Sequence, residues 1–274
     1  MNNGYMNYMV SESMSQNTIR AYTSDINSCL EFIGKPELEI KYKDLVSWKA
    51  SINHMSSATV ARKVASIKNY FEYLYDVEEI GSNPSLKLAS VQIKNKVKTA
   101  LTPAQIRAMV DCADKLRSKA IITMLASTGM RISELINLTI DQYHNNPIII
   151  KGKGDKERVV YITDATRDIV DQYLKTRNSN TQYSNLFLSS WCCPMQPNNV
   201  SLMLKNTAKR VGLENWESIS NHWLRTAAAT MQSEAGQPIE VIQEMLGHSC
   251  INTTRRYVKI ADKRLQQAMS VQLF

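Results

Sequence analysis

Residues 221–257 gather side chains that could act on a phosphodiester: His222 with Arg225 three positions later, and His248 with Tyr257 nine positions later. A guanidinium stays charged at physiological pH and offers a planar fork of donors to two phosphate oxygens. Imidazole can take or give a proton near neutral pH. A tyrosine hydroxyl is a weak nucleophile at its ordinary pKa of about 10, but nearby cations favour loss of its proton, and two arginines directly precede Tyr257. Such a tyrosine can form a covalent intermediate.

Each of these residues also has an ordinary structural explanation. A histidine beside a tryptophan is usually a packed side chain, and a tyrosine near a basic pair is usually an amphipathic surface residue. These explanations predict no particular spacing, so the joint arrangement favours the chemical interpretation.

The arrangement resembles that of the tyrosine recombinases, the family of phage integrases and Xer-type recombinases. The matching motifs are His-x-x-Arg, the Leu-Gly-His-Ser of residues 246–249, and the tyrosine that follows. Upstream, residues 128–135 (TGMRISEL) resemble the segment that carries the family's first catalytic arginine, and residues 151–158 (KGKGDKER) resemble its lysine-bearing β-hairpin. The resemblance implies six catalytic residues in this chain: Arg131, Lys153, His222, Arg225, His248 and Tyr257.

Two of these assignments have explicit rivals. Arg131 could instead be a surface arginine paired with Glu134, and the hairpin offers Lys151 and Lys156 beside Lys153. Position in the family pattern selects Lys153.

The resemblance also implies a mechanism. Tyr257 attacks the scissile phosphate, which leaves a 3′-phosphotyrosine and a free 5′-hydroxyl, while the two arginines stabilise the transition state. Lys153 protonates the leaving oxygen, His222 assists proton removal, and His248 hydrogen-bonds the phosphate. Because the phosphotyrosine keeps the bond energy, no cofactor and no metal is expected.

The implied partner is double-stranded DNA with a specific recombination site, bound by a homo-tetramer that passes through a Holliday junction. A second recombinase or accessory proteins are further possible partners. The possible biological roles are dimer or cointegrate resolution, integration and excision, and inversion. One alternative is DNA relaxation of the type IB topoisomerase kind, and another is a catalytically silent DNA-binding protein on the same fold.

Composition agrees with a DNA partner and a soluble protein. The 274 residues suffice for two domains, and the net charge of +8 suggests a polyanionic partner. Residues 1–82 carry 8 Lys and Arg against 10 Asp and Glu, whereas residues 83–274 carry 25 against 15, so the excess lies in the part with the phosphate chemistry. No apolar run could cross a membrane, and no secretory signal is evident, so we expect a cytoplasmic protein. The five cysteines show no metal-binding spacing, and we expect reduced thiols.

The fold is expected to be mainly α with a small antiparallel β-sheet: an all-helical, SAM-like N-terminal domain at 1–82, a basic linker at 83–99, and a mixed catalytic domain at 100–274 of the DNA breaking-rejoining type. In the first domain, apolar periodicity predicts helices over about 14–33, 42–52 and 57–74, after a mobile start at 1–13. The stretch from 45 to 71 has no acid, so its cations predict phosphate contacts. With those of the linker, the predicted DNA-binding residues are Lys49, Arg62, Lys63, Lys68, Lys94, Lys96 and Lys98.

In the catalytic domain, Thr102-Pro103 predicts a capped helix start, the first of two helices that end near 127. Arg131 then enters a short helix. Strand-like runs at 148–150 and 159–162 predict a β-hairpin, and a third short strand is expected at 186–188. Further helices are expected over 165–174, 198–211 and 263–274, the last docking on its own core or on a neighbouring protomer. Residues 191–194 (WCCP) match no pattern.

Overall fold

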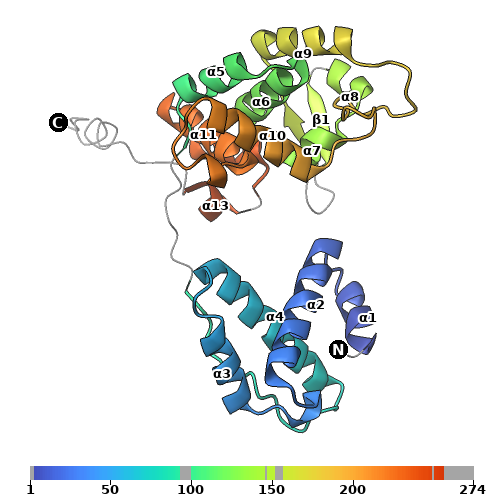
Figure 1. The fold of residues 1–274 in the computed structure, drawn as a ribbon, viewed down its shortest axis with the longest axis vertical. Helices are drawn as coiled ribbons and strands as arrows, with labels where there is room; N and C mark the ends of the chain where they lie inside the picture. Colours follow the sequence, from blue (N-terminus) through green and yellow to red (C-terminus); the bar gives the residue numbers. More distant parts are fainter. Residues whose placement is uncertain (1–2, 93–99, 146, 152–156, 249, 256–274) are drawn as a thin grey trace, which may run out of the picture. The chain divides into compact units, whose positions relative to one another are not determined.

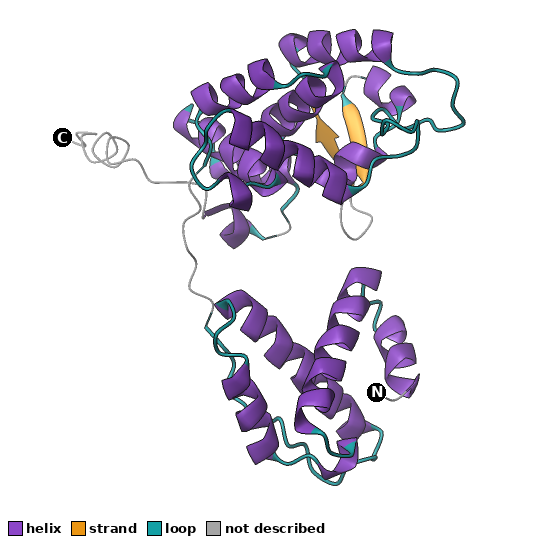
Figure 2. Ribbon diagram, viewed as in Figure 1, coloured by secondary structure: helices purple, strands orange, loops and turns teal. Residues whose placement is uncertain are grey.

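The computed structural model describes residues 3–92, 100–145, 147–151, 157–248 and 250–255. The chain is mainly helical, with one two-stranded antiparallel sheet (Figures 1 and 2). It divides into two compact units, residues 1–96 and residues 97–274, and each has its own hydrophobic core. The predicted fold class is confirmed.

The N-terminal unit is all helical, and its core includes fully buried side chains such as Trp48, Tyr70 and Phe71. The predicted helices are confirmed, and serine hydroxyls cap two of them, Ser15 accepting from the backbone of Thr18 and Ser56 from that of Thr59. The elements are α1 (Asn3–Ser11), α2 (Gln16–Ile33), a short 3₁₀ helix (Glu37–Glu39), α3 (Tyr42–Ser51) and α4 (Ser57–Asp76).

The prediction of a mobile start at 1–13 was wrong, because α1 is part of the core. Tyr5 and Met9 are fully buried. The Tyr5 hydroxyl donates to Oδ1 of Asn69 at 2.6 Å, and its ring meets the Tyr70 ring edge-on at 4.9 Å between centroids. The signal was the spacing of four between the two buried residues, which places them on one face of a helix.

The first part of the predicted linker packs on the N-terminal unit. Leu88 is buried in that unit's core, and Val91 packs against it. The ammonium group of Lys49 donates to the carbonyl of Ala89 at 2.6 Å. The linker was predicted to be extended from residue 83, but the chain still packs on the N-terminal unit as far as Val91. Lys94, Lys96 and Lys98 lie outside the described residues.

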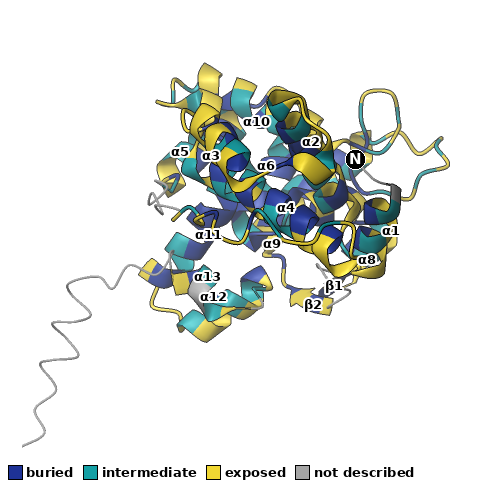
Figure 3. Cartoon of the chain, turned by 90° about the horizontal axis from the view of Figure 1, so that it is seen from below, coloured by how far each residue is buried: buried dark blue, intermediate teal, exposed yellow. Residues whose placement is uncertain are grey.

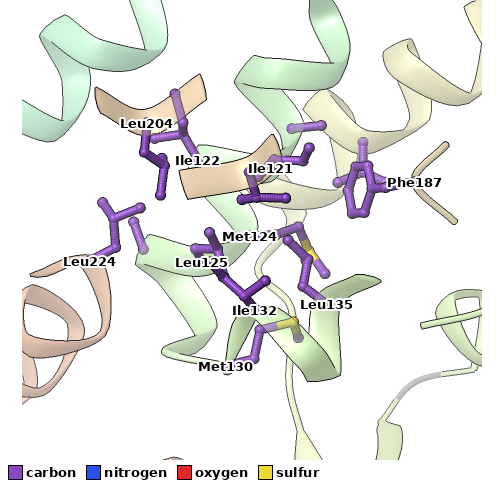
Figure 4. Close-up of a cluster of buried hydrophobic side chains, with 14 of the residues drawn as sticks. Ile121, Ile122, Met124, Leu125, Met130, Ile132, Leu135, Phe187, Leu204 and Leu224 are labelled. Carbon is purple, nitrogen blue, oxygen red and sulfur yellow. The ribbon is translucent and has the colours of Figure 1, made fainter. Parts of the chain in front are cut away.

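The second unit is built around α6, which is buried on nearly all sides. Figure 4 shows Ile121, Ile122, Met124 and Leu125 of this helix surrounded by apolar side chains from other segments. The elements are α5 (Pro103–Cys112), α6 (Leu116–Thr128), α7 (Ile132–Asn137), α8 (Ile140–His144), β1 (Ile148–Lys151), β2 (Glu157–Val160), α9 (Asp164–Thr176), α10 (Pro197–Arg210), a 3₁₀ helix (Trp216–Ser218), α11 (Asn221–Glu234), α12 (Ile239–Leu246) and α13 (Ile251–Arg255). The predicted cap is present, since Thr102 and Gln105 form a reciprocal capping box at the start of α5.

The β-hairpin is confirmed, with Ile148 opposite Val160 and Ile150 opposite Arg158. In β2 buried and exposed residues alternate (Figure 3), as expected for a sheet with one face on the core. The third strand predicted at 186–188 is absent from the described residues. That segment is buried, but it makes a single isolated bridge, between Leu188 and Pro194, and a proline cannot donate to a continuing ladder.

Candidate active site

Arg131 is presented by the sharp end of a buried helix. Gly129 ends α6 in the left-handed conformation (φ 61°), and a Cβ there would lie 2.9 Å from a methyl group of Leu246, so glycine permits both the turn and the close approach of α12. Arg131 then caps α7. Its backbone N–H donates to Oε2 of Glu134 at 2.7 Å, and its Nη1 donates to Oε1 at 2.7 Å.

Glu134 is a buried carboxylate shared by two arginines. Besides Arg131, it accepts from Nη2 of Arg158 at 2.7 Å. Burial alone would raise the pKa of Glu134, but the backbone N–H of Arg131 and the charge of Arg158 outweigh that effect and lower the pKa. The carboxylate is therefore ionised at neutral pH. The pair of Arg131 with Glu134, weighed as a sign of an ordinary surface arginine, is instead part of a buried network.

Arg225 lies on α11 and is 4% exposed. Its Nη1 donates to the carbonyl of Gly129 at 2.6 Å, and its Nη2 donates to the carbonyl of Leu246. The arginine is thus fixed between the C-terminal ends of α6 and α12, where helix carbonyls lack partners within their own helix. The three alanines after Thr226 are all buried, and Ala228 lies near Gly129, so their small size allows α11 to pack closely here.

Backbone carbonyls of the turn at residues 245–248 accept hydrogen bonds from three arginines. Gly247 ends α12 in the left-handed conformation (φ 61°), and its carbonyl lies 3.4 Å from Nη2 of Arg131. The carbonyl of Met245 accepts from Nη1 of Arg158. Together with the contact of Arg225 to Leu246, three guanidiniums bind three successive carbonyls. This turn therefore brings together three side chains that are spread over 94 positions of the chain, from Arg131 to Arg225.

The two predicted catalytic histidines lie on or directly after the helices that position Arg225, namely α11 and α12. His248 is the last residue of the turn, and its Nδ1 lies 2.9 Å from the hydroxyl of Thr254, which is fully buried. The Gln243 side chain donates to the His248 carbonyl at 2.9 Å, so both ring and backbone of His248 are held. His222 lies in the first turn of α11, three positions before Arg225, and residues at this spacing are neighbours on one helix face.

Two predicted catalytic residues fall outside the described residues. Tyr257 follows α13 (Ile251–Arg255) by two positions, and Lys153 lies between the ends of β1 and β2. The structure therefore brings together Arg131, Arg225 and His248 at one turn, with His222 on the helix that carries Arg225.

The predicted DNA-binding residues of the N-terminal unit differ in their surroundings. Asp25 of α2 is buried and pairs with Arg62 and with Lys63, whose Nζ lies 3.2 Å from Oδ1. The argument from the absence of acids between 45 and 71 missed this residue, because the acid comes from another helix. Lys49 and Lys68 are both partly exposed.

Sequence reasoning also missed three residues that hold the site. Arg158 and Thr254 contact groups that are distant or at an irregular spacing, so no local pattern indicates them. Glu134 did carry a signal, its position three residues after Arg131 at a helix start, where a glutamate commonly accepts from the backbone.

No helix among the described residues is long and apolar enough to cross a membrane. Within the same part of the chain, no group of three or more His, Cys, Asp or Glu side chains is placed to hold a metal ion.

Comparison with known proteins agrees with this architecture. The phage integrase family model matches residues 99–264, and the phage integrase N-terminal SAM-like domain model matches residues 3–78. Tyrosine recombinase XerA of Pyrococcus horikoshii is 32% identical over 271 residues, which cover 97% of this chain and 90% of the relative. Tyrosine recombinase XerC of Caldanaerobacter subterraneus subsp. tengcongensis is 29% identical over 97% of this chain and 84% of the relative.

Among solved structures, the XerH site-specific recombinase bound to a palindromic difH substrate shares the fold, with a TM-score of 0.75 and 23% identity over 92% of this chain and 79% of that one. A lambda integrase dimer bound to a core site has a TM-score of 0.77 with 15% identity, covering 95% of both chains. The chain belongs to the phage integrase family and is a tyrosine recombinase of the Xer-like kind.

Proposed function

We propose that this chain is a site-specific DNA recombinase that cleaves and rejoins double-stranded DNA through a 3′-phosphotyrosine on Tyr257. The observation that supports this most directly is the turn at residues 245–248, whose carbonyls bind the guanidiniums of Arg131 and Arg225 and which ends at His248. Preorganised cations at one place are what a phosphodiester needs as charge develops on its oxygens during attack.

The two arginines would act as fixed charges. Arg225 is held by the carbonyls of Gly129 and Leu246, which are neutral groups, so these contacts orient its positive charge without cancelling it. Arg131 shares a carboxylate but is about one-third exposed, with a side chain 35% accessible, and so can also reach a ligand. Each such donor contributes about 3 to 4 kcal/mol to transition-state stabilisation.

The remaining roles follow the family pattern. Tyr257 attacks the scissile phosphate, His222 assists removal of the tyrosine proton, and Lys153 protonates the 5′-oxygen as it leaves. His248 donates a hydrogen bond to the phosphate through Nε2, since Nδ1 faces Thr254. The reverse steps rejoin a 5′-hydroxyl to the 3′-phosphotyrosine, and no metal or nucleotide is consumed.

We further propose that residues 1–82 form a DNA-binding domain and that a homo-tetramer exchanges strands between two sites through a Holliday junction. The XerH and lambda integrase structures contain DNA, which supports a DNA partner for this chain. Among the predicted phosphate contacts of the N-terminal unit, Arg62 and Lys63 pair with Asp25. We therefore favour Lys49 and Lys68 as its phosphate contacts. The candidate biological roles are dimer or cointegrate resolution, integration and excision, and inversion, and the cytoplasm is the expected location.

The test starts by selecting a bound sequence from a randomised duplex pool with the full chain. A duplex of that sequence with a nick beside the scissile position then traps the intermediate, because the short cleaved fragment diffuses away. We expect a covalent protein–DNA adduct on a denaturing gel, and Tyr257→Phe should bind the duplex without forming it. An adduct of undiminished yield with Tyr257→Phe would mean that another residue is the nucleophile.

The same assay separates the alternatives. Binding without any adduct from the unmodified chain would indicate a catalytically silent DNA-binding protein. Relaxation of a supercoiled plasmid that lacks the selected sequence would instead favour topoisomerase-like activity.

A further inference from the structure

Arg158, in strand β2, is a buried arginine whose two terminal nitrogens bind different parts of the site. Its side chain is 7% exposed. Nη2 lies 2.7 Å from Oε2 of Glu134 in α7, and Nη1 donates to the carbonyl of Met245 in the last turn of α12. One guanidinium therefore joins the β-hairpin to both of these helices.

Each contact of Arg158 leads to a predicted catalytic group. Glu134 also accepts from the backbone N–H and from Nη1 of Arg131. The Met245 carbonyl belongs to the turn whose next two carbonyls accept from Arg225 and Arg131. Moving the Arg158 guanidinium would thus disturb both arginines from two sides.

We propose that Arg158 is a positioning residue for DNA cleavage: it aligns Arg131 through Glu134, and it holds the 245–248 turn that orients Arg225 and His248. This inference rests on the proposed function. Arg158 itself acts through other residues rather than on the phosphate, because its side chain is buried and both terminal nitrogens already bind protein acceptors.

The geometry requires a guanidinium and not merely a positive charge. The carboxylate and the carbonyl lie on two different nitrogens of one planar group, so a fork of fixed geometry spans them. A lysine would bring one compact ammonium group on a flexible stem, which can pair with Glu134 but is not preorganised to bind Met245 as well.

Gly247 supplies an independent observation on the same contact. A Cβ at Gly247 would lie 2.6 Å from Cδ of Arg158 and 3.1 Å from its Nε. Only glycine allows the Arg158 side chain to pass this close to the turn. Replacing Gly247 with alanine should therefore displace Arg158 without changing it.

The first test compares Arg158→Lys and Arg158→Ala with the unmodified chain on the nicked duplex selected above. We expect the single-turnover cleavage rate at saturating protein to fall about 100-fold in both variants, the size of effect that a small misplacement of catalytic groups produces. The dissociation constant for the duplex should change far less than the rate. Added methylguanidinium should recover part of the rate of Arg158→Ala and none of that of Arg158→Lys, whose side chain fills the space.

The second test uses Gly247→Ala with Gly212→Ala as the matched control. Both glycines have positive φ, 61° and 74°, but a Cβ at Gly212 meets no atom within 4 Å. We expect Gly247→Ala to lower the cleavage rate and Gly212→Ala to leave it near that of the unmodified chain. Both substitutions act on one contact, so their effects should not be independent. The cleavage rate of the Gly247→Ala, Arg158→Ala double variant should therefore fall by much less than the product of the fold-decreases of the two single variants.

The outcomes separate this inference from the function it builds on. No adduct from the unmodified chain overturns the proposed function. A normal adduct from the unmodified chain, with Arg158→Lys cleaving at the same rate, overturns the positioning role. If Arg158→Ala loses its thermal unfolding transition, the comparison of Gly247→Ala with Gly212→Ala decides, and equal rates for those two variants count against the inference.

Discussion

Each unit of the molecule contains a buried carboxylate that pairs with two cations, and the two clusters differ in the structural elements that they connect. In the N-terminal unit, Asp25 of α2 pairs with Arg62 and Lys63, which are adjacent on α4. In the C-terminal unit, Glu134 pairs with Arg131 and Arg158, which come from different elements and also bind carbonyls of the 245–248 turn.

The difference shows how the same group serves two purposes. The Asp25 cluster joins one helix to another, and the Arg62 side chain is 43% exposed, so water can replace its partner. The Glu134 cluster is extended by helix-end carbonyls, and the Arg158 side chain is 7% exposed, so nothing else can satisfy it. We therefore expect changes at Glu134 to affect both folding and catalysis, and changes at Asp25 to affect mainly the N-terminal unit.

The largest effect is expected for Glu134→Ala. Removing one partner of a buried ion pair leaves uncompensated charge, which costs about 3 to 5 kcal/mol. The free energy of unfolding of the C-terminal unit, measured in urea, should fall by this amount, and cleavage should fall with it because Arg131 loses two contacts. Glu134→Gln keeps the shape and serves as the milder control. A normal cleavage rate in folded Glu134→Ala would show that the carboxylate does not align Arg131.

A smaller loss of stability is expected for Asp25→Asn. The same substitution should strengthen DNA binding. Losing charged hydrogen bonds should cost the N-terminal unit about 1 to 3 kcal/mol of unfolding free energy. Freed from the acid, Arg62 and Lys63 become available to phosphates, so affinity for duplex DNA should rise and its salt dependence should steepen. The control is Asp44→Asn, which removes an exposed pair with Lys35 in the same unit. Unchanged affinity and salt slope would indicate that these two cations do not face DNA.

The smallest effect is expected in the pH dependence of the Glu134 cluster. The pKa of Glu134 is lowered below its ordinary value of 4.5, so its ionised form stabilises the fold fully above that pH. As pH falls below 4.5 and through the lower folded-state pKa, that contribution is lost. The difference in unfolding free energy between the unmodified chain and Glu134→Gln should shrink over this interval. A difference that stays constant from pH 6 to about pH 3 would contradict the lowered pKa.

Local sequence patterns predicted most of the helices and the hairpin, because each depends on neighbours within a few positions. Thr102 and Gln105 show this well, since their spacing alone indicates the capping box that begins α5. The predicted catalytic arginines and histidines came from motif spacing, and the structure brings Arg131 and Arg225 to the same turn.

The rest depended on contacts between distant segments. Asp25 lies 37 positions before Arg62, so the helix packing that pairs them is not visible in either segment alone. Arg158 meets Met245 across 87 positions, and its role follows from which face of β2 is buried. The missed helix α1 is different, because Tyr5 and Met9 carried a local signal that its polar neighbours obscured.

The carbonyls that hold the arginines belong to the main chain, and this determines which kinds of sequence change the site can tolerate. Replacing the partly buried side chain of Met245 leaves its carbonyl oxygen in place, so substitutions there can be absorbed, whereas Leu246 is fully buried and also packs in the core. Inserting or deleting one residue before Gly247 would rotate every carbonyl of the helix end by about 100°. We expect natural variation in this turn to change the side chain at position 245 far more often than the length of the turn.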